Sequence, residues 1–384
     1  METYELIAPC HFGMEAVLKR EIYDLGYEIS RVEDGKVTFV GDAEAICRSN
    51  IFLRTTERVL LKVAEFTATT FDELFEKTKA LPWERYIPAD GKFWVAKATS
   101  IKSRLFSPSD IQSIMKKAMV EHLKPVYGVN RFEETGASYP LRVTFMKDRL
   151  TIGLDTTGQS LHKRGYRKAT VKAPITETLA AALILFTPWK KDRILVDPFC
   201  GSGTFPIVAA MIGANIAPGM NRSFLAEEWD NLIARKEWYQ AVEEAQDLVE
   251  RDVKMDIQGY DLSPDAIKAA MENARLAEVE HLIHFQQRDV RDLSHRKKYG
   301  FVITNPPYGE RLEDKEAMPG LYKAMGQAYA GLEDWSWYMI TAYEEAERYF
   351  GRKADKNRKL YNGMMKTYFY QFMGAKPPAR RKEG

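Results

Sequence analysis

The sequence predicts an α/β protein in which a doubly wound parallel sheet follows a smaller α+β region. After about residue 170, helical patterns alternate with short apolar runs that each end in Asp, Asn, Gly or Pro, which is typical of β-α-β crossover units. Before that point, short strands and amphipathic helices are mixed. With 384 residues, 45% of them hydrophobic, the chain can form two or three domains. We expect domains at 1–65, 66–165 and 166–384.

The first region is predicted to be a small α+β unit. An amphipathic pattern after the first strand gives a helix that stops at Gly26. The expected strands are 4–10, 36–41 and 58–66, and the expected helices are 13–27 and 42–55.

The second region continues this mixture. A helix over 70–81 ends before Pro82, and a second helix begins after the candidate N-cap Ser107 and runs to residue 123. A strand is expected at 93–100. Two further strands lie within 141–157, joined at Lys147-Asp148, which is a candidate hairpin turn.

The third region carries the α/β alternation. A helix over 175–186 precedes the first strand, and the charged run 222–256 separates the first two strands by more than an ordinary crossover. We therefore interpret 222–256 as a helical insertion. The expected strands are 193–196, 257–261, 283–289, 301–305 and 335–343.

The net charge of +2 conceals a basic middle segment. Residues 92–168 hold 15 Lys and Arg against 6 Asp and Glu, with aromatic residues between them. This pattern is typical of a nucleic-acid surface, and equally of a solvated basic face.

Composition excludes other classes of protein. No run of about 18 apolar residues is present to cross a membrane, and the first twenty residues lack the apolar core of a secretion signal. Three widely spaced cysteines favour neither a disulfide framework nor a zinc site. We expect a cytoplasmic protein without a metal.

The strongest motif is a glycine loop, Asp197-Pro-Phe-Cys-Gly-Ser-Gly-Thr204, which follows a predicted strand. Gly201 and Gly203 allow a tight turn that brings backbone close to a ligand. The loop is not a phosphate-binding loop, because no Lys follows the second glycine.

Three more polar residues end later strands: Asp261, Asp289 and Asn305. Because parallel strands point their carboxyl ends to one edge, we expect them to share a ligand crevice with Asp197. A carboxylate after the second strand suits a ribose diol. Asp261 could alternatively serve only as a helix cap, but four such residues in register favour a site.

Asn305-Pro306-Pro307-Tyr308 is the second strong motif. Prolines fix the backbone, so the Asn305 side-chain oxygen and the Pro306 carbonyl can accept both N–H bonds of an exocyclic amine. Tyr308 offers a flat face for a base taken out of its stack. An ordinary Pro-rich turn is the simpler alternative, which the upstream glycine loop disfavours.

These motifs resemble class I S-adenosylmethionine-dependent methyltransferases that methylate amines. The match extends to Leu161-His-Lys-Arg-Gly-Tyr-Arg167, to Ala173-Pro-Ile-x-Glu177, to Ala217-Pro-Gly-x-Asn-Arg222 and to Asn305-Pro-Pro-Tyr-Gly-Glu-Arg-Leu312. Together they resemble the THUMP-domain 23S rRNA guanine-N2 methyltransferases over nearly the whole chain. The resemblance implies a Rossmann-like class I catalytic domain behind ferredoxin-like and THUMP RNA-binding modules, and an insertion after the first strand. It also implies a single methyltransferase activity, since the enterobacterial form carries a second fused domain.

The resemblance implies roles for individual residues. The glycine loop would hold the methionine part of the cofactor, Asp261 the ribose, Asp289 the adenine amine, and Asn305 the target base. The implied cofactor residues are Glu177, Thr178, Asp197, Pro198, Phe199, Cys200, Gly201, Ser202, Gly203, Thr204, Asp261, Leu262, Asp289, Val290 and Asn305. The implied catalytic residues are Asn305, Pro306, Pro307 and Tyr308.

The expected partner is RNA. Arg164, Arg167 and Lys168 at the junction are candidates for RNA contact, with an exposed linker as the alternative. The full set of candidates is Lys97, Lys102, Arg104, Lys116, Lys117, Lys163, Arg164, Arg167 and Lys168. The favoured substrate is 23S rRNA. A tRNA guanine, an adenine N6 in nucleic acid, and a non-catalytic assembly factor are the alternatives.

Other conspicuous residues are expected to be structural. Cys200 has no evident general base beside it, so packing is favoured over a nucleophilic role. His281, His284 and His295 lack metal-ligand spacing and are expected at the surface. Trp335 and Trp337 are expected in the core.

Overall fold

The computed structural model describes residues 2–168, 175–309, 312–363 and 365–378. These residues form two compact units, and each is built from more than one stretch of the chain. Unit 1 comprises 1–10, 19–161 and 222–244, and unit 2 comprises 11–18, 162–221 and 245–384. Ala173, Pro174, Glu310 and Arg311 of the sequence motifs lie outside the described residues.

Unit 1 is built on a seven-stranded sheet in the order β2-β3-β1-β4-β7-β6-β5. Neighbouring strands are antiparallel except the parallel pair β5 and β6. The strands are β1 (Tyr4–Pro9), β2 (Glu28–Glu33), β3 (Lys36–Gly41), β4 (Leu60–Thr67), β5 (Lys92–Ile101), β6 (Ser138–Met146) and β7 (Arg149–Asp155). One continuous sheet therefore joins the two predicted α+β regions.

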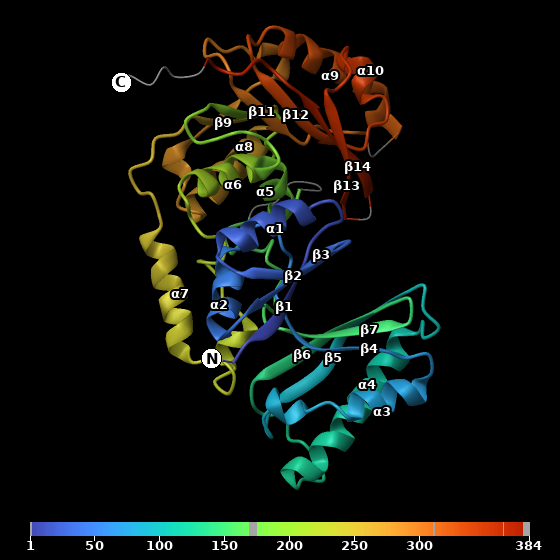
Figure 1. The fold of residues 1–384 in the computed structure, drawn as a ribbon. Helices are drawn as coiled ribbons and strands as arrows, with labels where there is room; N and C mark the ends of the chain where they lie inside the picture. Colours follow the sequence, from blue (N-terminus) through green and yellow to red (C-terminus); the bar gives the residue numbers. More distant parts are fainter. Residues whose placement is uncertain (1, 169–174, 310–311, 364, 379–384) are drawn as a thin grey trace. The chain divides into compact units, whose positions relative to one another are not determined.

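The helices of unit 1 follow the predicted pattern closely. They are α2 (Ala43–Phe52), α3 (Phe71–Lys79) and α4 (Pro108–Tyr127), together with the part of α1 (Glu15–Asp24) from residue 19 onward. Asp42 and Thr70 cap α2 and α3 by accepting backbone N–H bonds, which fixes where these helices begin. Figure 1 shows α3 and α4 side by side against the sheet that contains β4 and β7.

The predicted insertion differs in form and in placement. It holds a short 3₁₀ helix (Leu225–Glu228) and α7 (Arg235–Asp247) rather than one long helix, and residues 222–244 pack within unit 1. Trp229 is fully buried there, stacks on Tyr139 with ring centroids 5.0 Å apart, and donates from Nε1 to the Ser138 carbonyl over 2.9 Å. Buried aromatic side chains, rather than the charged ones visible in sequence, decide where this segment packs.

Unit 2 contains the predicted doubly wound sheet, in the order β10-β9-β8-β11-β12-β14-β13. The five strands from β10 to β12 are parallel, and β14 and β13 are antiparallel additions. The strands are β8 (Leu195–Asp197), β9 (Ile257–Asp261), β10 (Ile283–Gln287), β11 (Phe301–Thr304), β12 (Ser336–Thr341), β13 (Lys356–Asn362) and β14 (Met365–Phe372). The predicted fold class is confirmed, with an added terminal hairpin.

Helices cover both faces of this sheet, as Figure 1 shows, with α5, α6 and α8 on one face and α9 and α10 on the other. They are α5 (Glu177–Leu185), α6 (Thr204–Gly213), α8 (Pro264–Leu276), α9 (Leu312–Ala330) and α10 (Ala346–Phe350). Trp335 and Trp337 are 1% and 0% exposed and belong to the core under α9 and α10, as predicted. None of the helices in the described part of the chain is both long and apolar enough to cross a bilayer.

Candidate active site

A cavity of about 560 Å³ opens at the carboxyl ends of β8, β9 and β11 in unit 2. The strand order reverses between β8 and β11, which is where open α/β sheets bind ligands. The cavity brings together most of the predicted residues. Those lining it are Asp197, Pro198, Phe199, Cys200, Gly201, Ser202, Thr204, Asp261, Leu262, Asp289, Val290, Asn305, Pro306, Pro307 and Tyr308.

The glycine loop turns tightly from β8 into α6. Gly201 and Gly203 have φ angles of 53° and 86°, which side chains rarely adopt. Gly203 does not line the cavity; a Cβ there would lie 3.0 Å from the Cβ of Ala270 and 3.2 Å from the Phe285 ring. The Cys200 amide donates to the Tyr260 carbonyl over 2.8 Å, so the loop is also tied to β9.

Asp197 is the most deeply buried carboxylate of the cavity, with 1% of its surface exposed. Its Oδ1 accepts hydrogen bonds from Thr304 Oγ1 at 2.5 Å and from the Phe199 amide at 3.1 Å. Burial raises the pKa of Asp197 from 3.8 to about 7, and these two hydrogen bonds oppose that rise. The group can therefore change its protonation near neutral pH when a cation approaches.

Asp261 lies at the end of β9 and closes the loop from the other side. Its Oδ2 accepts from the Gly201 amide at 3.0 Å, and its Oδ1 accepts from the Ser263 amide at 2.9 Å. The N-cap of α8 is Ser263, whose hydroxyl accepts from the Ala266 amide. Asp261 is thus more than a cap, and each carboxylate oxygen keeps accepting capacity for a hydroxyl group.

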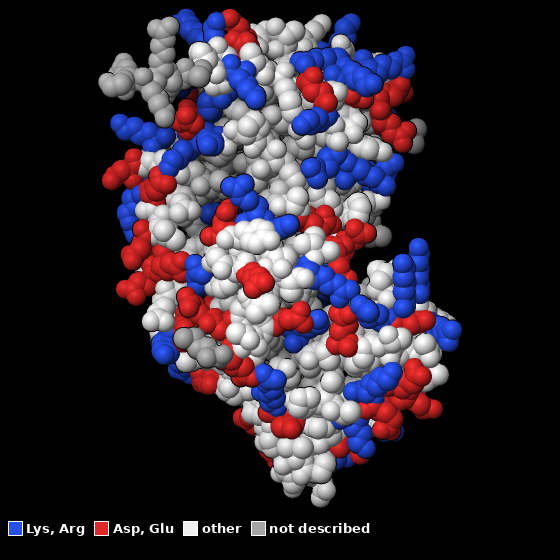
Figure 2. Space-filling model, viewed as in Figure 1, with Lys and Arg blue, Asp and Glu red and all other residues white. Residues whose placement is uncertain are grey.

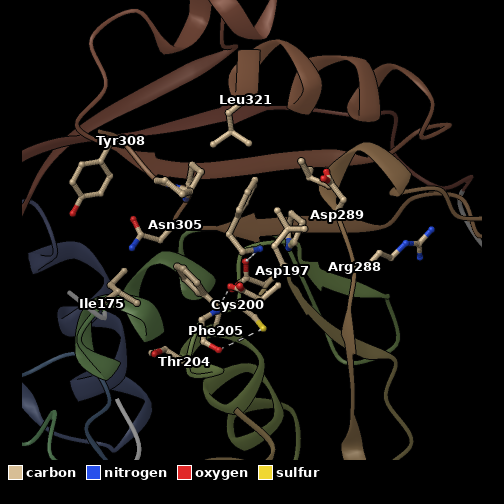
Figure 3. A pocket seen from close by; sticks show the side chains of 18 of the residues that line it. Ile175, Asp197, Cys200, Thr204, Phe205, Arg288, Asp289, Asn305, Tyr308 and Leu321 are labelled. Carbon is tan, nitrogen blue, oxygen red and sulfur yellow. Dashed lines mark hydrogen bonds between the residues drawn. The ribbon is translucent and has the colours of Figure 1, made fainter. Parts of the chain in front are cut away.

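Asp289 lies at the other end of the cavity, beside residues that the sequence analysis missed. Its Oδ1 accepts from the Arg291 amide at 2.8 Å, and its Oδ2 pairs with the Arg291 guanidinium at 2.7 Å. Figure 3 places Arg288 and Asp289 at one end of the cavity, Asn305 and Tyr308 at the opposite end, and Asp197 between them. The charged run Arg288-Asp-Val-Arg-Asp292 is the signal that could have indicated both arginines.

The turn that begins at Asn305 follows β11 directly, and the Asn305 side chain can bind a ligand. The Asn305 side chain is half-buried at the cavity wall and has no hydrogen-bond partner among the described residues. The Pro307 carbonyl accepts from the buried hydroxyl of Tyr322 over 3.2 Å, and Tyr322 also contacts Thr341. The turn is therefore fixed from α9 and β12, while Asn305 stays open to a ligand.

Further residues that line the cavity had no site role in the sequence analysis, although Ile175 and Gly309 lie within motifs quoted there. Arg288 and Arg291 flank Asp289, while α9 contributes apolar side chains that helical periodicity alone does not assign to a site. The lining residues that the sequence analysis did not assign to the site are Ile175, Phe205, Arg288, Arg291, Gly309, Ala317, Met318 and Leu321.

Two predicted cofactor residues, Glu177 and Thr178, do not line the cavity. Both lie in the first turn of α5 with 2% and 1% of their surface exposed. The Glu177 carboxylate pairs with Arg167 at 3.0 Å instead. Both side chains are therefore buried outside the set of residues that line the cavity.

The predicted RNA residues fall into two groups. Figure 2 shows basic side chains gathered on unit 1 at the side where Figure 1 labels β4 and β7. The exposed candidates are Lys97, Lys102, Arg104 and Lys117 in unit 1 and Lys163 and Lys168 in unit 2. The others are engaged internally, since Lys116 contacts Glu134 and the Phe93 carbonyl, and Arg167 pairs with Glu177.

Arg164 corrects the expectation of an exposed junction. It is 2% exposed, and its guanidinium donates to the Glu177 carbonyl over 3.3 Å. Its neighbour Gly165 has a φ of 86°, and a Cβ there would lie 2.2 Å from the Asn221 carbonyl oxygen. The junction motif is therefore partly a packing motif, which the charge pattern alone does not reveal.

Cys200 is buried, whereas the three histidines are exposed or half-buried. Burial, with Asp197 nearby, raises the pKa of the Cys200 thiol, which disfavours a nucleophilic thiolate. His281 and His284 are exposed, and the half-buried His295 packs on Trp335 with ring centroids 5.5 Å apart. No group of three potential metal ligands is found in the described ranges.

Three family models match the chain in succession. Residues 5–60 match the RlmL ferredoxin-like domain, residues 68–155 match the THUMP domain, and residues 164–371 match the RMKL-like methyltransferase domain. The last match covers more than half of the chain. The chain belongs to the RMKL-like methyltransferase family.

Individual relatives of this family member agree with the assignment. YpsC of Bacillus subtilis, provisionally named an RNA methyltransferase, is 49% identical over 100% of this chain and 99% of its own length. Ribosomal RNA large subunit methyltransferase K/L of Syntrophotalea carbinolica is 33% identical over 94% of this chain, which spans about half (52%) of that protein. A crystal structure of SMU.472, provisionally named a methyltransferase and complexed with S-adenosylhomocysteine (SAH), has 43% identity and a TM-score of 0.93. That match covers 98% of this chain and all of the other.

Proposed function

We propose that this methyltransferase transfers a methyl group from S-adenosylmethionine to the exocyclic N2 of a guanine in 23S rRNA. The observation that carries the proposal is the Asn305 side chain, which lies beside Tyr308 at one end of the cavity and has no hydrogen-bond partner in the described part of the chain. Binding residues for a nucleoside cofactor occupy the rest of the same cavity.

The cofactor is S-adenosylmethionine, and the residues present fit it. Asp197 is a buried carboxylate that suits an ammonium group, and Asp261 keeps accepting capacity for a ribose diol. Asp289 can accept from the adenine amine. The sulfonium of this cofactor supplies a methyl group that is already activated, so the protein mainly aligns it with the amine. The relative with bound SAH supports the same assignment.

The target amine is held by the Asn305 turn. An aryl amine is a weak nucleophile because its lone pair is delocalised into the ring. The Asn305 side-chain oxygen and the Pro306 carbonyl would accept its two N–H bonds, favour a pyramidal nitrogen and stabilise the developing positive charge. Tyr308 would stack on the base after it leaves the helix, which costs a few kcal/mol for a paired guanine.

The RNA substrate is supported by the chain outside the catalytic unit. Residues 68–155 match the THUMP domain, and exposed basic residues of unit 1 suit phosphate contacts. The name of the K/L relative supports large-subunit rRNA. The chain covers about half of that relative, and the proposal rests on the matched half.

The test is methyl transfer in vitro. Purified protein is incubated with isotope-labelled S-adenosylmethionine and with separate 23S rRNA, 16S rRNA and tRNA from cells lacking the protein. Each RNA is then digested to nucleosides for mass spectrometry. Label in N2-methylguanosine from 23S rRNA alone supports the proposal. Label in tRNA, label in N6-methyladenosine, or cofactor binding without transfer favours the tRNA, adenine or assembly-factor alternative, respectively.

A further inference from the structure

Arg167 binds three residues at the wall of the cofactor cavity, namely Ile175, Glu177 and Thr204. Its Nε lies 3.0 Å from Glu177 Oε1, and its second terminal nitrogen donates to the Ile175 carbonyl at 3.1 Å and to Thr204 Oγ1 at 2.6 Å. Ile175 and Thr204 both line the cavity, whereas Arg167 does not. The guanidinium therefore lies outside the cavity and contacts two of the residues that line it.

Burial makes this arrangement specific. The Glu177 side chain is 3% exposed and the Arg167 side chain 15%. A buried carboxylate is costly unless a cation and hydrogen bonds compensate it, so Glu177 holds the guanidinium in place. The planar, rigid fork of an arginine can serve three acceptors in fixed directions, which a single lysine ammonium cannot reproduce.

A second connection reaches the same loop from the next residue. The Lys168 amide donates to Asn273 Oδ1 at 3.3 Å, and Asn273 Nδ2 donates to the Ser202 carbonyl at 3.1 Å. Asn273 is fully buried on α8, and Ser202 lines the cavity. The segment 167–168 is thus joined to both sides of Gly203, the residue at which the loop enters α6.

We propose that Arg167 is a positioning residue that sets the affinity for the cofactor by fixing Thr204 and Ile175. The inference rests on the cofactor assignment of the proposed function and does not depend on which RNA is methylated. Glu177, which the resemblance placed at the cofactor, acts through Arg167. The methionine end of the cofactor is the part that this wall would orient.

The test compares SAH binding by calorimetry in the full chain. Arg167→Lys is expected to weaken SAH binding about tenfold, since a charge-assisted hydrogen bond is removed. Thr204→Val should have a similar effect. If Arg167 acts through Thr204, the double variant should be about as weak as the weaker single variant rather than the product of both. The matched control is Arg275→Lys, an exposed arginine of α8 that pairs with Glu272 and should leave SAH affinity within about twofold.

Activity gives an independent readout. Arg167→Lys should raise the KM for S-adenosylmethionine with a smaller change in kcat, because positioning of the cofactor, not the amine, is affected. If lysine disturbs folding, the double variant Arg167→Gln/Glu177→Gln removes both buried charges together. Its melting temperature should be close to that of the wild type, and its affinity for SAH should still be weakened.

Two results would overturn the inference: an Arg167→Lys affinity equal to that of the control, or full multiplication of the Arg167 and Thr204 effects. A wild-type protein that binds no SAH would overturn the proposed function together with it. A protein that binds SAH as expected but methylates another RNA would contradict the proposed function alone.

Discussion

Thr304 donates a hydrogen bond to Asp197, with 2.5 Å between Oγ1 and Oδ1. Thr304 is the last residue of β11 and precedes Asn305, while Asp197 is the last residue of β8 and begins the glycine loop. Both side chains are buried. This hydrogen bond therefore joins the candidate cofactor loop to the candidate base-binding turn, across the point where the strand order reverses.

Removing this hydroxyl should destabilise the catalytic unit. Thr304→Val leaves the buried Asp197 with one hydrogen bond fewer, which is expected to lower the free energy of unfolding by about 1–3 kcal/mol. Thr304→Ser keeps the hydroxyl and is the control. Urea unfolding measures both variants, and equal stabilities for Val and Ser would contradict the importance of this bond.

The pH dependence of stability should report on Asp197. Burial raises its pKa in the folded protein to about 7, above its ordinary 3.8. The folded state then binds the proton more tightly than the unfolded state. The resulting stabilisation is fully present below pH ~4 and is lost as pH rises through ~7, with a size on the order of 4 kcal/mol.

The isosteric variant Asp197→Asn isolates this contribution because it cannot titrate. Its free energy of unfolding, relative to that of the wild type, is expected to increase between pH 5 and pH 7.5. Denaturant unfolding at four or five pH values within that range measures the difference. A constant difference would show that Asp197 is already ionised at pH 5 in the folded protein, and would contradict the raised pKa.

The sequence predicted the parallel core of unit 2 and its candidate ligand residues for a simple reason. Strand-end residues such as Asp261 and Asn305 are adjacent in sequence to the apolar runs that define their strands. Parallel topology then brings them to one edge. The confirmed alternation therefore predicted both the fold class and the cavity that now contains these residues.

The features that were missed depend on long-range packing. In the sequence, Arg164 looks like an exposed basic residue within a basic segment. Its burial against Glu177 follows only from the tertiary fold. The strand β2 and the hairpin β13–β14 have weak or mixed apolar patterns. They form strands because of the strands that they pair with. The same holds for 222–244, where the buried Trp229 outweighs a charged, helical composition.

The inserted segment is expected to be needed for the stability of unit 1. Trp229→Ala removes a fully buried ring that stacks on Tyr139 and should cost about 3–5 kcal/mol. Tyr239→Ala, at a residue that is 72% exposed on α7, should cost little. Hydrogen exchange of β6, the strand that contains Tyr139, localises the effect. Unchanged protection there in Trp229→Ala would contradict the packing role of the segment.

The exposed basic residues of unit 1 should determine how RNA affinity depends on salt. Replacing Lys102 and Arg104 with Gln is expected to weaken RNA binding and to flatten the slope of log K against log salt by about 0.7–0.9 for each phosphate that is no longer neutralised. Lys236→Gln, at an exposed lysine of α7 beside Glu237, is the control. Filter binding at several salt concentrations measures the slopes, and a wild-type slope in the double variant would exclude these residues from phosphate binding.

The central claim concerns Asn305 and the base it holds. The most direct measurement is mass spectrometry of nucleosides from separated 23S rRNA, 16S rRNA and tRNA, comparing cells that carry Asn305→Ala with wild-type cells. Asn357→Ala, at an exposed asparagine of β13, is the control. Loss of an interaction that stabilises transition-state charge lowers kcat by about 100-fold or more. The account therefore predicts that N2-methylguanosine falls in 23S rRNA alone in Asn305→Ala cells; loss from tRNA, loss of N6-methyladenosine, or unchanged pools would contradict it.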